Sequence, residues 1–445
     1  MHSRLTHPPV VLVGAFLAVI AIGTALLMLP AATADGQPTY WVTALFTATS
    51  AACVTGLVIV DTGTYWSGFG QAVILALFQL GGFGIMTSAT LLGLLVNRNL
   101  RLRSRLLLQA ETHSLDLGDV KSVGKLVLAV TVVVELLVAA VLTVRFAFAL
   151  DMGWGEALWH GVFHAVSAFN NAGFSTWPES VSRFVAHPTV LVPLMLAIVI
   201  GGLGFPVLHE LWQRWKAVER RPLSIHAALT LWGSATLIVG GTVVLLLAES
   251  GNPDTLGNMS APGRVLAALF TSVSARTAGF NAIDIGALTH ESLTLHYLLM
   301  FIGGGSAGTA GGVKVTTFAL LLLVVWNEVR GHPDVEFRRR RIASAAQRQA
   351  ITVLVLSAGA VVLGMLVLVP MTSHPYEKVL FEVVSAFATV GLSTGITADL
   401  PAAGHLVLVV LMFAGRVGVV TLAAAIAINT ARRIYRLPEE KPIVG

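Results

Sequence analysis

The chain has 445 residues, of which 55% are hydrophobic and only 11% are charged, and its formal net charge is +5. A soluble globular protein of this length covers its surface with many more polar groups, so the composition excludes that class and indicates a chain that lies in lipid. The single cysteine, Cys53, excludes an intramolecular disulfide framework and a multi-cysteine metal site.

Eight apolar stretches are long enough to cross a bilayer, which takes about 20 helical residues. In chain order they cover residues 10–29, 68–96, 123–150, 190–212, 227–248, 293–325, 350–371 and 403–428. The first stretch lies close to the amino terminus, where a cleaved signal peptide is the alternative. It has no clear small-residue cleavage site, which favours a retained helix. The sequence therefore predicts an all-α polytopic membrane protein with eight transmembrane helices.

The basic residues are sorted between the loops. They gather at the amino terminus and in the ranges 98–125, 214–221, 330–348 and 432–441. The intervening loops instead carry Asp61, Glu156, Glu179, Asp254, Asp284, Glu291 and Asp399. By the positive-inside rule the basic loops and both termini are cytoplasmic, and an even number of spans requires the same answer.

The run of four arginines at 338–341 is interpreted as an anchor of this topology. Its alternative is a nucleic-acid or regulatory patch, but the basic residues are not gathered on a folded basic domain. We therefore expect a multi-pass protein of the plasma (inner) membrane that contacts lipid and binds no nucleic acid.

Four shorter apolar segments, near 42–53, 157–170, 264–275 and 377–388, are too short to span. Each contains Phe-x-x-x-Ser-Ala and runs into a glycine five or six residues after the serine. We call these endings glycine segments 1 to 4: Val54-Thr55-Gly56, Asn171-Ala172-Gly173, Thr277-Ala278-Gly279 and Thr389-Val390-Gly391. The pattern indicates a fourfold internal repeat with units at 1–115, 116–223, 224–347 and 348–445.

Each repeat is predicted to consist of a span, a short helix, a glycine segment and a second span. The short helix and the glycine segment together form a re-entrant pore loop. Non-helical backbone at membrane depth is tolerated only where it is buried in protein or lines a water-filled cavity. Four such segments around one central pore can present backbone carbonyls that replace the hydration shell of a potassium ion. Glycine suits them because it reaches positive φ, and the carboxyl ends of the short helices favour a cation. The alternative, that these glycines only let helices approach closely, does not account for their shared spacing.

The second span of the third repeat contains Gly303-Gly304-Gly305-Ser306-Ala307-Gly308-Thr309-Ala310-Gly311-Gly312, with Lys314 shortly after it. A glycine costs roughly 1 kcal/mol in a helix interior, so we expect the helix to break there and the loop to face the cavity. Arg416 lies near the middle of the last span, where a cation costs at least about 2.5 kcal/mol. Two interpretations of Arg416 stay open: an electrostatic barrier below the pore, or a structural partner of loop carbonyls or an acidic side chain.

Four other polar residues in apolar segments receive structural interpretations. Glu135 and Glu382 are predicted to be paired rather than ion-binding, and Asn170 and Asn171 to donate to the backbone of glycine segment 2. His160 and His164 have metal-ligand spacing on a short helix, but a third ligand is missing and no zinc site is predicted.

The four glycine segments, the string Arg276-Thr-Ala-Gly-Phe-Asn281 and the eight-span layout resemble the Trk/Ktr/HKT superfamily of potassium transporters. The resemblance covers essentially the whole chain and is closest to the membrane subunit (KtrB type) of bacterial Ktr systems, because the first repeat starts at once. Trk-type subunits usually carry two additional spans before it. Plant HKT proteins often have serine at the first filter position, where this chain has Gly56, so the resemblance implies a potassium-selective filter formed by glycine segments 1 to 4.

The resemblance further implies a gate below the filter, formed by residues 303–312, Lys314 and Arg416. Arg276 is predicted to brace the filter from behind, because a cation that points into a potassium filter would repel the transported ion. The resemblance also implies a homodimer on a ring of cytosolic nucleotide-binding regulatory subunits (KtrA type), with the nucleotide on that partner. This chain itself is expected to bind no cofactor; potassium is the transported ion and sodium a candidate activator.

The sequence also bears on two other classes of function, an intramembrane enzyme and a secondary transporter. An intramembrane enzyme needs catalytic groups, and the sequence has no His-Glu-x-x-His, no Gly-x-Ser-x-Gly and no aspartate pair within spans, so no enzyme is predicted. A secondary transporter with inverted repeats would alternate repeat orientation, whereas all four repeats start on the same predicted side. A sodium- and potassium-permeable or cation-coupled secondary transporter remains the alternative.

Overall fold

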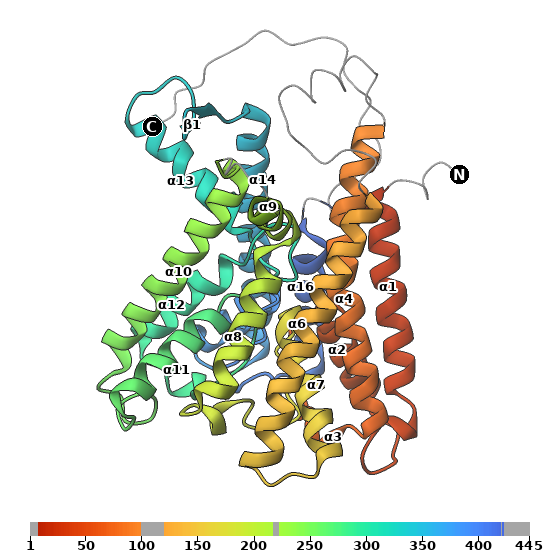
Figure 1. Ribbon diagram of the computed structural model, residues 1–445. Coiled ribbons are helices and arrows are strands. Elements are labelled where there is room, and N and C mark those ends of the chain that lie inside the picture. Colours follow the sequence, from red (N-terminus) through yellow and green to blue (C-terminus); the bar gives the residue numbers. More distant parts are fainter. Residues whose placement is uncertain (1–7, 99–119, 217–221, 420, 422–445) are drawn as a thin grey trace, which may run out of the picture.

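The computed structural model describes residues 8–98, 120–216, 222–419 and 421, and these residues are mostly helical. Long helices run alongside one another in one bundle, with α1 (Pro8–Leu27) and α10 (Ile225–Glu249) at opposite edges of the view (Figure 1). The described residues contain one antiparallel hairpin, β1 (Glu336–Phe337) and β2 (Arg340–Arg341). This hairpin and α3 (Thr62–Tyr65) lie at opposite ends of the bundle (Figure 1).

The remaining helices fall into two groups. The first group is α4 (Gly68–Arg98), α6 (Val120–Ala149), α8 (Pro188–Leu203), α13 (Val315–Val329), α14 (Ser344–Leu368) and α16 (Ala402–Val417). The second group, which contains the four helices that precede the glycine segments, is α2 (Trp41–Ala52), α7 (Trp154–Asn170), α9 (Phe205–Lys216), α11 (Ala261–Ser274), α12 (His290–Phe301) and α15 (Tyr376–Ala388). Single 3₁₀ turns occur at Pro30–Ala32, Ser182–Phe184, Ile285–Ala287 and Val369–Met371.

Within the described residues, four helical segments are long and apolar enough to cross a membrane: Val10–Leu27, Leu126–Ala149, Ile225–Glu249 and Ser344–Met371. The pair α8 and α9 passes the same test together but is bent by 100°, and Gly68–Phe83, α13 and α16 are shorter apolar helices. Apolar side chains such as Leu136 and Leu137 of α6 are more than 60% exposed, which is the outward face that a lipid solvent favours. The fold is thus mostly helical with several membrane-length apolar helices.

Two predicted spans are not single helices. The stretch 190–212 ends α8 at Leu203, and Gly204 then takes a φ of +88°, which turns the chain into the amphipathic helix α9. A left-handed conformation of this kind stops a helix and favours glycine. The stretch 293–325 is α12 and α13 with residues 303–312 between them, so the helix breaks where the sequence predicts it.

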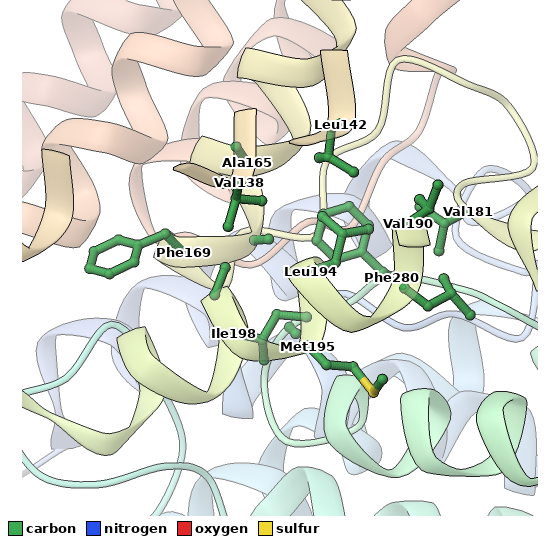
Figure 2. Packing of buried hydrophobic residues seen from close by; sticks show 14 of the residues in the cluster. Val138, Leu142, Ala165, Phe169, Val181, Val190, Leu194, Met195, Ile198 and Phe280 are labelled. Carbon is green, nitrogen blue, oxygen red and sulfur yellow. The ribbon is translucent and has the colours of Figure 1, made fainter. Parts of the chain in front are cut away.

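A buried apolar cluster packs the short helix α7 between α6 and α8, and Phe280 joins it from the segment after α11 (Figure 2). Phe169 and Phe280 are each 1% exposed. Contacts of this kind depend on close packing, because lipid tails are as apolar as the side chains themselves. The cluster therefore holds α7, and with it glycine segment 2, at a fixed position in the bundle.

Glycines in the long helices lie against the carboxyl ends of the short helices. A Cβ added at Gly81 would meet the carbonyl of Ala52, one at Gly201 that of Phe169, and one at Gly415 that of Phe387. Each of these carbonyls belongs to the second residue after the serine of Phe-x-x-x-Ser-Ala. The glycines in α4, α8 and α16 therefore permit a close approach of long helix to short helix.

This packing predicts that Gly415→Ala destabilises the protein although alanine is the better helix former. The new Cβ would overlap the backbone of Phe387, and such overpacking costs about 1–3 kcal/mol, more than the roughly 1 kcal/mol of helix propensity gained. The matched control is Gly359→Ala in α14, where nothing lies within 4 Å of the added atom. We expect a lower melting temperature of the purified protein for Gly415→Ala only; equal melting temperatures for both variants would contradict the packing argument.

Candidate functional site

The four glycine segments share one unusual backbone conformation. In each, both the first residue and the glycine have positive φ. The values are +56° and +93° for Val54 and Gly56, +58° and +72° for Asn171 and Gly173, +76° and +77° for Thr277 and Gly279, and +50° and +93° for Thr389 and Gly391. A positive φ is uncommon for a non-glycine residue and is a genuine outlier for β-branched Val54, Thr277 and Thr389. Strain repeated at four corresponding positions indicates a functional requirement on the backbone.

The four glycines form a closed ring. A Cβ added at Gly56 would meet Gly173 Cα and the carbonyl of Ala172; one at Gly173 would meet Gly279 Cα and the carbonyl of Ala278. A Cβ added at Gly279 would meet Gly391 Cα and the carbonyl of Val390. A Cβ added at Gly391 would meet Gly56 Cα and the carbonyl of Thr55, which closes the ring. The segments therefore follow one another around a common axis in chain order. Segments 2 and 4 lie opposite each other in this ring, as do segments 1 and 3.

The serine of each Phe-x-x-x-Ser-Ala motif holds its glycine segment in place. The carbonyls of Ser50, Ser167, Ser274 and Ser385 accept hydrogen bonds from the residue before the glycine, at 2.7, 2.8, 2.9 and 2.9 Å. The hydroxyls of the first three donate to the carbonyl after the glycine, at 2.7, 2.8 and 2.6 Å, and Ser385 Oγ accepts from Gly391 N. In the sequence these serines mark the repeat, and their bonds to the glycine segments were not predicted. Their constant position in Phe-x-x-x-Ser-Ala is the sequence feature that could have indicated these bonds.

The surroundings of the ring favour a cation. Helices α2, α7, α11 and α15 end one to three residues before the glycine segments, so their partially negative carboxyl ends lie close to the ring. The ring itself presents backbone rather than side chains, because each glycine lies too close to the next segment for a Cβ. Four carbonyl-bearing segments around one axis can coordinate a dehydrated cation.

The loop at 303–312, between α12 and α13, contacts segment 4 and the two helices that flank segment 2 in the chain, α7 and α8. Gly305 N donates to Gly202 O (2.7 Å), Thr309 N to Gly201 O (3.1 Å) and Thr309 Oγ1 to Phe169 O (3.2 Å). On the other side, a Cβ at Gly311 would meet Thr389 Oγ1 and the carbonyl of Ala388. The loop therefore lies between segment 4 and the helices that flank segment 2, on the side of the residues that precede the glycines.

Two cationic side chains are attached to this loop. Arg416 of α16 donates from Nη1 to Thr309 O and from Nη2 to Gly81 O (3.1 Å), and Lys314 donates from Nζ to Ala310 O (2.5 Å). Arg416 is 4% exposed. Neither cation forms an ion pair with an acidic side chain among the described residues. Of the two interpretations of Arg416, the loop-carbonyl pairing is therefore present in the structure, and it does not exclude an electrostatic role.

Arg276 lies behind the ring, as the sequence predicts. Its guanidinium donates to Ser234 Oγ (3.1 Å) of α10 and to Gly303 O (3.0 Å), the first residue of the loop. It lines a small pocket together with Asn171, Ser234 and Gly304. Arg276 thus connects segment 3 to the loop and to α10.

The prediction for Asn170 and Asn171 is wrong. Asn170 Nδ2 donates to Gln79 Oε1 (2.6 Å), Glu135 Oε1 (3.3 Å) and Val166 O (2.9 Å), none of which belongs to segment 2. With its amide oriented to satisfy its neighbours, Asn171 donates to Ala168 O and Ile198 O. The cause is the packing of α7 on α4 and α6, which brings Gln79 and Glu135 to Asn170. These contacts confirm that Glu135 is paired.

The histidines of α7 are also occupied by neighbours in α7 and the chain after it. His160 Nδ1 lies 2.5 Å from Thr176 Oγ1, and His164 bonds His160 O and Ser175 Oγ. Among the described residues no group of three or more His, Cys, Asp and Glu side chains could hold a metal ion.

Comparison with known proteins identifies the chain as one of a family. The family described as "TrkH: Cation transport protein" matches residues 2–433. The chain is 38% identical to "Ktr system potassium uptake protein B" of Bacillus subtilis (strain 168), covering 99% of this chain and 97% of the relative. It is 35% identical to the protein of the same name from Vibrio alginolyticus, covering 98% and 95%.

Two further proteins bear on fold and substrate. The "Potassium/sodium uptake protein NtpJ" of Enterococcus hirae is 35% identical, covering 100% of this chain and 98% of the relative. The crystal structure of the potassium transporter TrkH from Vibrio parahaemolyticus has a TM-score of 0.69 at 19% identity, covering 92% of this chain and 84% of that one, which shows a shared fold. The full-length match and the ring of four glycine segments lead to one conclusion: the chain belongs to the TrkH family of cation transport proteins.

Proposed function

We propose that this chain is the pore-forming subunit of a Ktr-type potassium uptake system in the plasma membrane. The observation that carries the proposal is the closed ring of four glycine segments with the same strained backbone. The names of relatives at 35–38% identity over nearly the whole chain support potassium as the ion. An enzymatic activity forms no part of the proposal, since the family is described by cation transport.

The selectivity filter of this proposal consists of glycine segments 1 to 4, residues 54–56, 171–173, 277–279 and 389–391. Backbone carbonyls replace the hydration shell of potassium there, and the strained φ values keep those carbonyls in place. The serine hydrogen bonds behind each segment resist collapse of the ring toward a smaller ion. All four positions are glycine, which favours potassium over sodium.

The gate of the proposal is the loop 303–312 with Lys314 and Arg416. In this proposal the loop crosses the ring axis, and the buried charge of Arg416 next to it raises the barrier for a permeating cation. Glycine makes up much of the loop, so its backbone can adopt another path without side-chain clashes. Movement of the loop away from the axis would open the pore.

The wider assembly follows the same proposal. The chain has eight spans in four repeats (1–115, 116–223, 224–347 and 348–445), with both termini and the arginine-rich β1–β2 hairpin in the cytoplasm and α3 outside. It forms a homodimer on a ring of cytosolic regulatory subunits that bind the nucleotide. The word "system" in the names of two relatives supports partner subunits. The name of the relative "Potassium/sodium uptake protein NtpJ" supports one alternative, a pore or coupled transporter that also carries sodium.

The proposal is tested in a bacterium that lacks its own potassium uptake, expressing this chain with and without a cognate regulatory subunit. We expect growth on low potassium and tracer uptake of rubidium in preference to sodium. Correct insertion of the chain with neither growth nor tracer uptake would refute the filter assignment and favour the coupled-transporter alternative. Equal uptake of sodium and rubidium would support the sodium-permeable alternative.

Gly56→Ser tests the filter directly. A side chain at Gly56 displaces the carbonyl of Ala172, and a loss of about 1.4 kcal/mol in ion discrimination lowers the rubidium-to-sodium uptake ratio about tenfold. The matched control is Gly36→Ser, which also has a positive φ (+72°) but open space around the added atom. An unchanged ratio in a normally inserted Gly56→Ser protein would show that Gly56 is outside the filter.

Arg416→Gln tests the gate. Glutamine retains a donor for Thr309 O but removes the charge, so we expect faster rubidium uptake and a weaker requirement for the regulatory subunit. The control is Arg264→Gln, whose guanidinium also donates to two backbone carbonyls, those of Met259 and Gly257, away from the loop. An Arg416→Gln protein with unchanged uptake and unchanged melting temperature would contradict both the barrier and the structural pairing.

A further inference from the structure

A second set of corresponding positions surrounds the ring. It consists of four pairs of residues, one pair in each repeat. The first residue of a pair directly follows the phenylalanine of Phe-x-x-x-Ser-Ala, and the second lies two residues after the glycine of the glycine segment. The four pairs are Thr47 and Val58, His164 and Ser175, Thr271 and Asn281, and Glu382 and Ser393. Each pair consists of one residue of a short helix and one residue of the chain that leaves the ring.

The pair in segment 4 contains a fully buried carboxylate. Glu382 is 0% exposed, and its Oε1 accepts from Ser393 Oγ (2.5 Å) and Thr394 N (3.1 Å). Its Oε2 accepts from Thr397 Oγ1 (2.8 Å). Three donors from the stretch directly after Gly391 therefore converge on one side chain of α15. No basic side chain within the described residues forms an ion pair with Glu382.

The pair in segment 2 makes the corresponding contact with a neutral group. His164 Nδ1 bonds His160 O (2.8 Å), which leaves Nε2 to accept from Ser175 Oγ at 3.0 Å. The imidazole stacks on Trp177 with ring centroids 4.3 Å apart. His164 is 0% exposed, like Glu382. Each of these two segments is thus attached to its own short helix after the glycine.

The other two pairs make no such contact in the described structure. Val58 is apolar, and Thr271 Oγ1 and Asn281 Oδ1 are buried atoms without a hydrogen-bond partner. Asn281 is instead held through its backbone, which bonds Ser180 Oγ and Val181 N. Because segments 2 and 4 are opposite in the ring, the two attachments lie on opposite sides of the axis, and of the two only the one in segment 4 is made by a carboxyl group.

We propose that Glu382 is a positioning residue for ion selection: it fixes the chain after Gly391 through Ser393, Thr394 and Thr397, and its charge favours a cation at that end of the ring. This inference rests on the proposed function and adds a side-chain determinant that the four glycines do not supply. Its three hydrogen bonds favour the charged form of the carboxyl group, whereas its burial opposes that form. The same three bonds hold the carboxyl group and the chain after Gly391 in one arrangement.

Two variants separate the charge from the attachment. Glu382→Gln keeps the size of the side chain and an oxygen that accepts from Ser393 and Thr394, but removes the charge. We expect the rubidium concentration for half-maximal uptake to rise about tenfold, with the maximal rate unchanged. Ser393→Ala keeps the charge and removes one donor, and we expect the rubidium-to-sodium ratio to fall roughly fivefold.

Glu249→Gln is the matched control. Glu249 is also 0% exposed and accepts from Asn252, Thr255 and Thr289, but it joins the end of α10 to the start of α12, away from the ring. Rubidium half-saturation, the rubidium-to-sodium ratio and the amount of inserted protein are measured for the full chain with its regulatory subunit. We expect wild-type half-saturation and a wild-type ratio for Glu249→Gln at equal protein amounts.

Each outcome decides the inference. Wild-type half-saturation in an inserted Glu382→Gln protein, or an equal shift in Glu249→Gln, overturns it. If Glu382→Gln does not accumulate, Ser393→Ala decides alone, and an unchanged ion ratio overturns the inference. If the rubidium-to-sodium ratio changes in Gly56→Ser but neither Glu382→Gln nor Ser393→Ala has an effect, the proposed function is retained and the role of Glu382 is rejected. If the wild type takes up no rubidium, the proposed function itself is rejected.

Discussion

The structure depends on one constraint: backbone polar groups inside a bilayer must be paired or must line a polar cavity. The four glycine segments are non-helical, and they satisfy this constraint together rather than singly. Each segment is bonded to a serine of its own short helix, and each glycine lies against a carbonyl of the next segment. The ring therefore needs all four segments at fixed positions. The close packing of the short helices against glycines of the long helices provides those fixed positions.

The four segments share a backbone but differ in the side chains behind it. Segment 2 is attached through His164, segment 4 through Glu382, and segment 3 is connected to the loop through Arg276. One long loop, 303–312, lies between α12 and α13 and contacts both segment 4 and the end of α7. A chain with four unequal units can thus combine a ring of four similar segments with a loop and attachments that the four units do not share.

The charges around the ring are also unequal. Lys314 and Arg416 both donate to carbonyls of the loop, on the side of the residues that precede the glycines, whereas Glu382 lies on the other side. Removing a cation from water is costly unless other groups satisfy its donors, and here backbone carbonyls do so in place of carboxylates. Among the described residues, the donors of Lys314 and Arg416 are therefore satisfied by backbone carbonyls rather than by an acidic side chain.

The sequence by itself determined the short helices, the four glycine segments and the break at 303–312, because apolar length, glycine spacing and helix-breaking composition are local properties. It also indicated that Glu135 and Glu382 were paired, since an isolated charge in an apolar segment is too costly. It could not determine their partners. Asn170 bonds Gln79 and Glu135 only because α7 packs on α4 and α6, and the 100° turn at Gly204 depends on a backbone angle that glycine permits but does not require.

Only the tertiary structure decided the order of the segments around the ring and the opposition of segments 2 and 4. The same is true of the convergence of Ser393, Thr394 and Thr397 on Glu382 and of the contact between Arg416 and Thr309, which is 107 residues away in the chain. Contacts between distant residues depend on which helices pack side by side. That choice belongs to the whole bundle and leaves no local pattern in the sequence.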